Sequence, residues 1–155
     1  MLLLDTQVWI WWLLRDEALT EEELQTLDEH ARKGEIAVSA ASVWEAELLE
    51  GSGKLFLKEN FESWIVKATD PKVCKVIPID TQVISAQRKL PITFPDDPAD
   101  RLIVTTALMN NYSLATKNEK IQNIEKKKLR SNKHIEIATE KKLERRIEKN
   151  IILMN

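Results

Sequence analysis

Three acidic residues stand where short strands and helix starts would carry them to one edge of a sheet. Asp5 directly follows the apolar residues 1–4, which are typical of a short buried strand. Glu45 lies one turn into a helix that is expected after a strand over 35–39, and Asp100 lies at the start of a later helix. In a parallel sheet the strands end at the same edge, so these carboxylates are expected to converge.

Convergence of carboxylates would be costly without a cation. Two of them about 4 Å apart repel by roughly 4 kcal/mol at an effective dielectric constant near 20. Such a cluster either keeps a proton on one member or binds a hard divalent ion. Ligands that are all oxygen favour Mg²⁺ or Mn²⁺ over zinc. An ion of this kind suits phosphodiester hydrolysis, because it activates water, orients a phosphate oxygen and neutralises developing charge.

Simpler roles compete for most of these acids. Asp97, directly before a proline, is typical of a helix N-cap. Asp100 would complement the dipole of the same helix, and Glu45 is spaced to close a capping box with Ser42. Asp5 has no comparably simple role, because it follows an all-apolar strand.

The predicted elements alternate between strand and helix. Expected strands cover residues 1–4, 35–39, 73–79, 112–116 and 135–138. Expected helices cover residues 6–13, 20–34, 43–50, 60–68, 80–90, 97–110 and 120–127. This order predicts an α/β fold, a three-layer sandwich whose mostly parallel central sheet of four or five strands is flanked by helices.

The length of 155 residues fits one domain, which we expect to span residues 1–138. Residues 139–155 are expected to form an added C-terminal helix. Leu143, Ile147 and Ile151 recur there at helical spacing.

Composition excludes several classes of protein. The longest apolar run, Val8–Leu14, is far shorter than the roughly 20 residues of a membrane span, so no membrane association is expected. Asp5 stands where a secretory signal would be basic, so no such signal is expected. The single cysteine, Cys74, fits a reducing cytoplasm.

Charge is unevenly distributed. Residues 1–100 carry 10 Lys and Arg against 19 Asp and Glu, whereas residues 101–155 carry 13 against 6. This asymmetry fits an acidic site beside a cationic surface for a polyanion, and it equally fits a solvated helical surface.

Four segments resemble one known family. They are LLLDTQVWIWWL (2–13), VSAASVWEAELLEGSGKL (38–55), DDPADRLIVTTAL (96–108) and LATKNEKI (114–121). In content, order and separation they resemble the PIN-domain ribonucleases, in particular the VapC-like toxins of bacterial toxin–antitoxin pairs. The resemblance covers roughly residues 1–125.

The resemblance implies a set of metal ligands. Asp5, Glu45 and Asp100 match acids that hold Mg²⁺ or Mn²⁺ in the family, and they would be the catalytic residues here. The position of a fourth family acid is occupied by Asn118, which carries no charge, and the acid beside it is Glu119. This departure argues against two bound metal ions.

Further residues are expected to support the acids or to contact substrate. The hydroxyls of Thr6, Ser39 and Thr116 lie beside the predicted acids, and Thr6 would alternatively cap the first helix. The other candidates are Asp97 and Asn118, together with Lys54, Arg101 and Lys117 as contacts for RNA phosphates. Arg101 would alternatively pair with Asp97.

The implied function is a metal-dependent endoribonuclease that acts as the toxin of a toxin–antitoxin pair. The resemblance also implies a homodimer, an RNA substrate, a cognate antitoxin protein and a cytoplasmic location. The alternative is a weak or inactive PIN-like module that binds antitoxin or RNA without cleaving, which Asn118 favours. A structure-specific DNA nuclease fits less well, because the chain lacks insertions that would grip duplex junctions.

Overall fold

The computed structural model describes residues 1–122 and 151–153 and has a parallel sheet at its centre. Its strands are β1 (Leu2–Leu4), β2 (Ile36–Ser39), β3 (Lys75–Ile77), β4 (Ser113–Thr116) and β5 (Ile151–Leu153). They lie in the order β3-β2-β1-β4-β5, and every neighbouring pair is parallel. Chain order reverses beside β1, which lies between β2 and β4. In open sheets of this type, ligands bind beyond the carboxyl ends of the strands at such a point.

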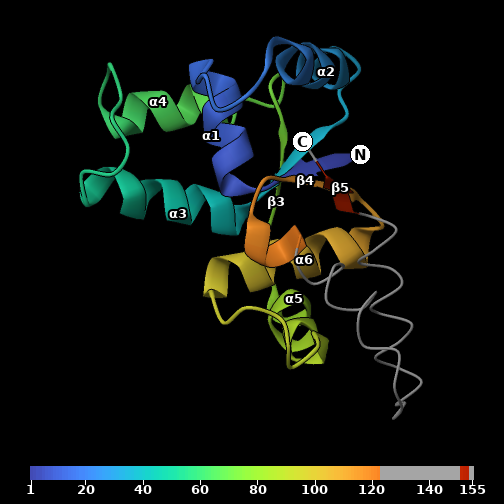
Figure 1. Ribbon diagram of the computed structural model, residues 1–155. Coiled ribbons are helices and arrows are strands. Elements are labelled where there is room, and N and C mark those ends of the chain that lie inside the picture. Colours follow the sequence, from blue (N-terminus) through green and yellow to red (C-terminus); the bar gives the residue numbers. More distant parts are fainter. Residues whose placement is uncertain (123–150, 154–155) are drawn as a thin grey trace.

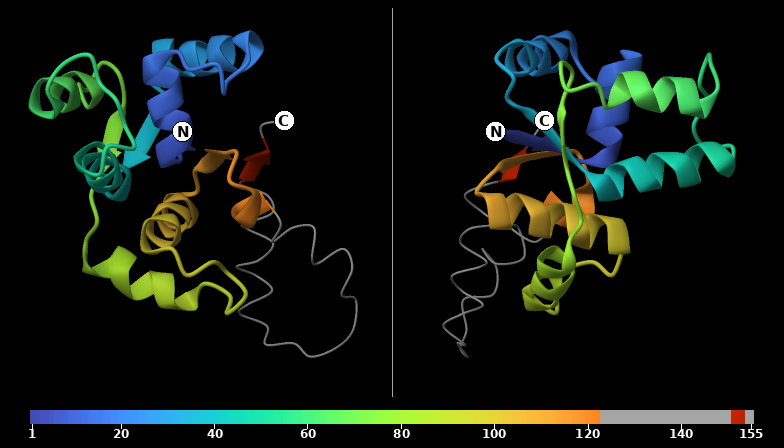
Figure 2. Two further views of the ribbon diagram at one scale, coloured as in Figure 1. Left: turned by 60° about the vertical axis from the view of Figure 1, so that its left-hand side comes forward. Right: turned by 180° about the vertical axis from the view of Figure 1, so that it is seen from behind.

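Helices cover both faces of the sheet. They are α1 (Thr6–Leu14), α2 (Glu21–Arg32), α3 (Ala40–Gly51), α4 (Phe61–Ala68), α5 (Thr81–Ala86), a 3₁₀ turn η1 (Gln87–Lys89) and α6 (Pro98–Asn110). Figure 1 shows α1, α2 and α4 on one side of the sheet and α5 and α6 on the other, and both views in Figure 2 keep this separation. The predicted three-layer α/β sandwich is therefore confirmed. Within the described residues, no helix is both long and apolar enough to cross a membrane.

Alternation along the strands divides the core in two. In β1, Leu2 and Leu4 belong to the cluster beneath α1, α2 and α4, whereas Leu3 belongs to the cluster beneath α6. This follows from the two-residue period of a strand, which turns successive side chains to opposite faces. Both faces are buried, so the strand is apolar at every position and ends at the first residue that is not, Asp5.

Local start signals agree with the structure at two helices. Thr20 and Glu23 form the predicted capping box of α2, and Asp97 caps α6 with Pro98 at its first position. Pro78 follows β3 directly, and β3 is an edge strand, as its proline suggested.

The predicted C-terminal helix is wrong at residues 151–153. Ile151–Leu153 form β5, whose backbone pairs in parallel with β4 from Leu114 to Thr116. Three consecutive apolar residues, two of them β-branched, suit a strand that covers the open edge of β4. The remaining positions of that prediction, the strand expected over 135–138 and the domain boundary at 138 lie outside the described residues.

The core makes a stability prediction that uses two isoleucines. Ile103 in α6 is fully buried, whereas Ile92 is 97% exposed. Replacing Ile103 by Ala should lower the free energy of unfolding by about 2–5 kcal/mol, because a cavity remains where the side chain was packed. Urea denaturation of both variants measures this. Ile92→Ala should change stability by no more than about 0.5 kcal/mol, and equal effects at the two positions would contradict the core assignment.

Candidate functional site

The site lies where β1 and β4 end side by side. The Asp5 backbone N–H donates to the Ala115 carbonyl at 3.0 Å, which brings the end of β1 against β4. The Thr116 hydroxyl then donates to Asp5 Oδ2, and the Asn118 backbone N–H donates to the same hydroxyl oxygen at 3.0 Å. Asp5 is only 5% exposed, and Thr116 is fully buried. The first acid is therefore held by a chain of hydrogen bonds that starts on the neighbouring strand.

Asp5 is also the N-cap of α1. Its Oδ1 accepts from the Val8 backbone N–H at 2.8 Å, so the expectation that Thr6 caps this helix is wrong. Asp5 has extended backbone angles at the end of β1, which suit an N-cap, whereas Thr6 is already helical. Burial raises the pKa of Asp5 to about 6, against the hydrogen bonds from Thr116 and Val8. Its carboxylate is therefore costly to ionise without a cation.

Glu45 lines the pocket from α3, which begins earlier than predicted. Ser39 is the N-cap, and its Oγ accepts from the Ala41 backbone N–H at 3.1 Å. The proposed capping box between Ser42 and Glu45 is therefore wrong. Ser42 Oγ instead accepts from the Thr6 hydroxyl at 3.0 Å, which ties α3 to α1 and leaves the Glu45 side chain for the pocket.

Burial raises the pKa of Glu45, and the charge of Asp97 adds to this rise, while the nearby Thr6 hydroxyl offsets part of it. Glu45 in turn helps to raise the pKa of Asp5. These two acids come from α1 and α3, and electrostatic repulsion already couples them.

Asp100 lies at the start of α6, opposite the end of β4. Its backbone N–H donates to the N-cap Asp97 at 3.0 Å, and its Oδ2 accepts from the Asn118 amide nitrogen at 3.0 Å. Asn118 Oδ1 accepts from the Lys120 backbone N–H at 2.9 Å, which fixes the amide orientation. Burial raises the pKa of Asp100 to about 7, and nearby carboxylates add to the rise. In decreasing order these are Asp97, Glu45 and Asp5.

These side chains line one pocket of about 300 Å³. Among the predicted residues, Asp5, Thr6, Glu45, Asp97, Asp100, Lys117 and Asn118 line it. Ser39 and Thr116 are fully buried and do not line the pocket; Thr116 contacts Asp5, whereas Ser39 caps α3. Glu119 is exposed to solvent. The structure thus brings together the three acids that lie far apart in sequence, and their catalytic and metal-binding roles remain predictions.

Two of the predicted basic contacts are directed elsewhere. The Arg101 guanidinium donates to the side chain and the backbone carbonyl of Gln87 and stacks on Phe94, so its suggested pairing with Asp97 is wrong. Lys117 lines the pocket, but its ammonium group is bonded to Ala18 and Glu23.

The pocket also includes residues that the sequence did not single out. Gln7 and Trp11 line it from α1, and Lys120 lines it from beyond β4. Gln7 and Trp11 are four residues apart, a spacing that places them on the same helical face as the pocket. That spacing was the available signal, once Asp5 was known to start the helix.

Within the described residues, there is no group of three or more His, Cys, Asp or Glu side chains that could hold a metal ion without some movement. The four carboxylates that line the pocket nevertheless offer only oxygen ligands, and burial and repulsion raise the pKa values of Asp5, Glu45 and Asp100. A hard divalent cation is the ligand that relieves this repulsion and matches this donor chemistry.

The raised pKa values make a prediction about pH. Asp5 and Asp100 keep their protons up to about pH 6 and pH 7 when folded, compared with about pH 4 when unfolded. The folded state therefore binds more protons in this window, and the free energy of unfolding of the metal-free protein should fall as pH rises through it. Asp100→Asn should flatten this fall and stabilise the protein at about pH 8 relative to wild type. Urea denaturation in EDTA at several pH values measures both effects.

Asp28 is the matched control, because the hydrogen bond from Arg15 lowers its pKa although burial opposes this. The same substitution at Asp28 should destabilise the protein at about pH 8. Destabilisation by Asp100→Asn at that pH would contradict the unfavourable burial and repulsion that raise the pKa of Asp100.

Comparisons with known proteins agree with this geometry. The family model described as PIN domain matches residues 2–127. A relative from Mycobacterium tuberculosis, Ribonuclease VapC22, is 32% identical over 120 residues, which cover 77% of this chain and 88% of the relative. A solved structure described as FitAB bound to an IR36 DNA fragment matches with a TM-score of 0.56 and 23% identity. That match covers 77% of this chain and 86% of the other, and it shows a shared fold.

Proposed function

The chain belongs to the PIN domain family, and from this premise we propose that it is a metal-dependent endoribonuclease that acts as a bacterial toxin. The pocket of converging carboxylates carries the proposal. Asp5 reaches it from the end of β1, Glu45 from α3 and Asp100 from α6, so a local role in a single helix does not account for their shared pocket. The name of the similar ribonuclease supports RNA as the substrate.

Asp5, Glu45 and Asp100 would hold the Mg²⁺ or Mn²⁺ ion. When bound, such an ion supplies Lewis acidity for water and phosphate and neutralises charge that develops in the transition state. Asp97 has only one carboxylate oxygen left for the pocket, because the other already caps α6. Its second oxygen adds negative charge near the ligands, which supports a role in tuning the site.

The remaining contacts orient the acids. The Thr116 hydroxyl fixes Asp5, and the Asn118 amide fixes Asp100. An ionised aspartate at position 118 would have no proton to donate to Asp100 and would add a further charge. The amide therefore fits a site in which three carboxylates bind one ion.

Lys120 is exposed at the edge of the pocket, where its ammonium group is available to an RNA phosphate. Arg101 does not support this role, because its guanidinium is bonded to Gln87. Substrate contact is therefore better assigned to Lys120 than to Arg101.

A second candidate function is a module that binds RNA or antitoxin without cleaving. Its support is Asn118, which carries no charge at the position where the family commonly has a fourth acid. RNA binding without metal-dependent cleavage would favour this candidate.

Asparagine in place of Asp5 tests the catalytic role with its cap retained. Asn is also a good N-cap, so Asp5→Asn should preserve α1 while removing a charged ligand. We expect the rate of RNA cleavage in Mg²⁺ or Mn²⁺ to fall by more than the roughly 10–100-fold that loss of an outer partner of a metal ligand costs. EDTA should abolish cleavage by the wild-type protein.

Asp80→Asn is the matched control. Asp80 caps α5 by accepting from the Val83 backbone N–H at 2.9 Å, as Asp5 does from Val8, but it lies outside the pocket. This variant should cleave RNA at the wild-type rate. Full activity of Asp5→Asn, or cleavage that persists in EDTA, would refute the proposed chemistry.

The proposal includes an antitoxin partner, a homodimer and action in the cytoplasm, all of which the family resemblance supports. Expression of the wild-type chain in a bacterial host should arrest growth, whereas Asp5→Asn should not. Co-expression of a small protein encoded immediately upstream should restore growth and co-purify with a dimer of this chain. Growth that is unaffected by the active nuclease would argue against a toxin role while leaving the nuclease proposal intact.

A further inference from the structure

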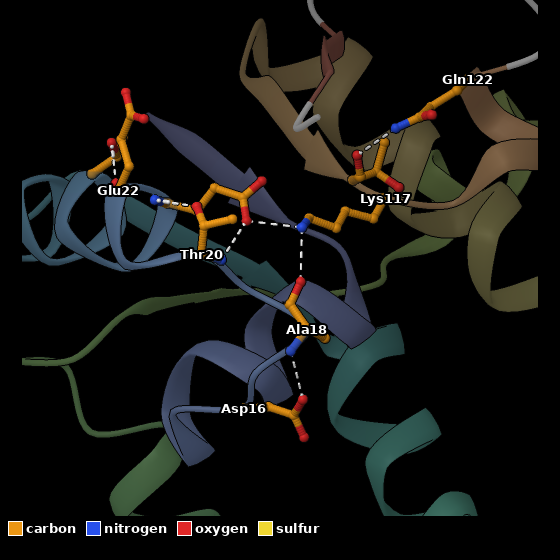
Figure 3. A network of polar contacts seen from close by, with 9 residues as sticks. Asp16, Ala18, Thr20, Glu22, Lys117 and Gln122 are labelled. Atoms are coloured by element: carbon orange, nitrogen blue, oxygen red, sulfur yellow. Dashed lines mark hydrogen bonds and ion pairs between the residues drawn. The ribbon is translucent and has the colours of Figure 1, made fainter.

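Lys117 occupies an unusual position for a lysine. It follows β4 directly, between Thr116 and Asn118, and its side chain is only 21% exposed. It lies against a pocket full of carboxylates, yet its ammonium group is bonded outside that cluster. Nζ donates to the Ala18 carbonyl at 2.7 Å and to Glu23 Oε2 at 2.8 Å. Figure 3 shows this side chain extending from the end of β4 to the segment that joins α1 and α2.

Its partner Glu23 is equally constrained. The Glu23 side chain is 13% exposed, and its Oε2 also accepts from the Thr20 backbone N–H at 2.8 Å in the capping box of α2. Burial opposes ionisation of Glu23, but the hydrogen bonds from Lys117 and Thr20 prevail and lower its pKa. The Glu23 carboxylate is therefore ionised and held in position by the Thr20 backbone N–H, and Lys117 binds to it.

This ion pair differs from the others in the described residues. Lys67 and Glu59 pair at 2.7 Å, but their side chains are 71% and 34% exposed. Exposed pairs contribute little, because water screens the charges and ordering two long side chains costs entropy. The Lys117 ammonium is largely shielded from water and has two short charge-assisted contacts, so its geometry is held more firmly.

The residues on either side of Lys117 hold the acids. Thr116 donates to Asp5, and Asn118 donates to Asp100. Of these three consecutive residues, Lys117 binds Glu23, and its two neighbours contact Asp5 and Asp100. These two predicted metal ligands lie 95 positions apart in sequence.

We propose that Lys117 is a positioning residue, whose contacts with Glu23 and Ala18 fix residues 116–118 and thereby set the relative placement of Asp5 and Asp100. This inference rests on the proposed function, in which those two acids bind a divalent ion. It assigns Lys117 to the organisation of the site rather than to substrate or to neutralisation of the acidic pocket.

Mn²⁺ binding in the absence of RNA tests the inference without relying on activity. Isothermal titration or the electron paramagnetic resonance signal of free Mn²⁺ gives the dissociation constant. We expect Lys117→Met to weaken Mn²⁺ binding by about 10-fold or more, the size of effect seen when an outer partner of a metal ligand is lost. Lys67→Met, which breaks the exposed pair between α4 and Glu59, should bind Mn²⁺ within about two-fold of wild type.

Two further variants separate positioning from general loss of stability. Ile103→Ala is expected to destabilise the core, and it should leave Mn²⁺ affinity unchanged at temperatures where the protein is folded. Glu23→Gln keeps an oxygen for Thr20 while removing the charge that binds Lys117, so it should weaken Mn²⁺ binding even if Lys117→Met fails to fold. The double variant at positions 23 and 117 should bind no more weakly than Lys117→Met alone, because both changes break one interaction.

The outcomes are distinguishable. If the wild-type chain binds no Mn²⁺, the proposed function fails, and this inference fails with it. If the wild type binds Mn²⁺ and the variants at positions 117 and 23 bind equally well, the positioning role is overturned while the proposed function stands. A loss of Mn²⁺ affinity that Ile103→Ala reproduces would also overturn it.

Discussion

Burial, reinforced by electrostatic repulsion among the carboxylates that line one pocket, is the constraint on which the site depends. Asp5 is buried, Asp100 is partly buried, and both share a pocket with Glu45 and Asp97. The pKa rises to about 6 at Asp5 and about 7 at Asp100, which shows that the folded chain tolerates the full negative charge poorly. A fold that maintains such a cluster in the absence of a cation must hold each acid by other means.

The structure does this with neutral donors. A threonine hydroxyl reaches Asp5, an asparagine amide reaches Asp100, and backbone N–H groups reach Asp5 and Asp97. These donors partly stabilise the charged forms without neutralising them. Lys117, one of two lysines that line the pocket, is bonded to Glu23 rather than to this cluster. The pocket therefore retains a negative charge that suits a divalent ion, which links this arrangement to the nuclease family.

Sequence signals succeeded where a few neighbouring residues determine the structure. The capping box of Thr20 and Glu23 and the Asp97-Pro98 start of α6 depend on contacts within four residues, and both are present. Similar signals at Thr6 and Ser42 were misleading, because Asp5 and Ser39 lie at strand ends with extended backbone angles and cap these helices first. The helix predicted for the C-terminal segment was wrong for a different reason. Residues 151–153 pair as a strand with the edge of β4, although apolar residues recur at helical spacing in that segment.

The amino-acid sequence by itself determined the alternation of strands and helices, and it placed an acid after β1, within α3 and at the start of α6. These features follow from hydrophobic period and local capping, which act over short separations along the chain. Only the tertiary structure decided that Arg101 turns to Gln87, that Asn118 donates to Asp100 and that Lys117 crosses to Glu23. The last of these contacts joins residues 94 positions apart, and its partners are selected by strand order and packing, which no local pattern encodes.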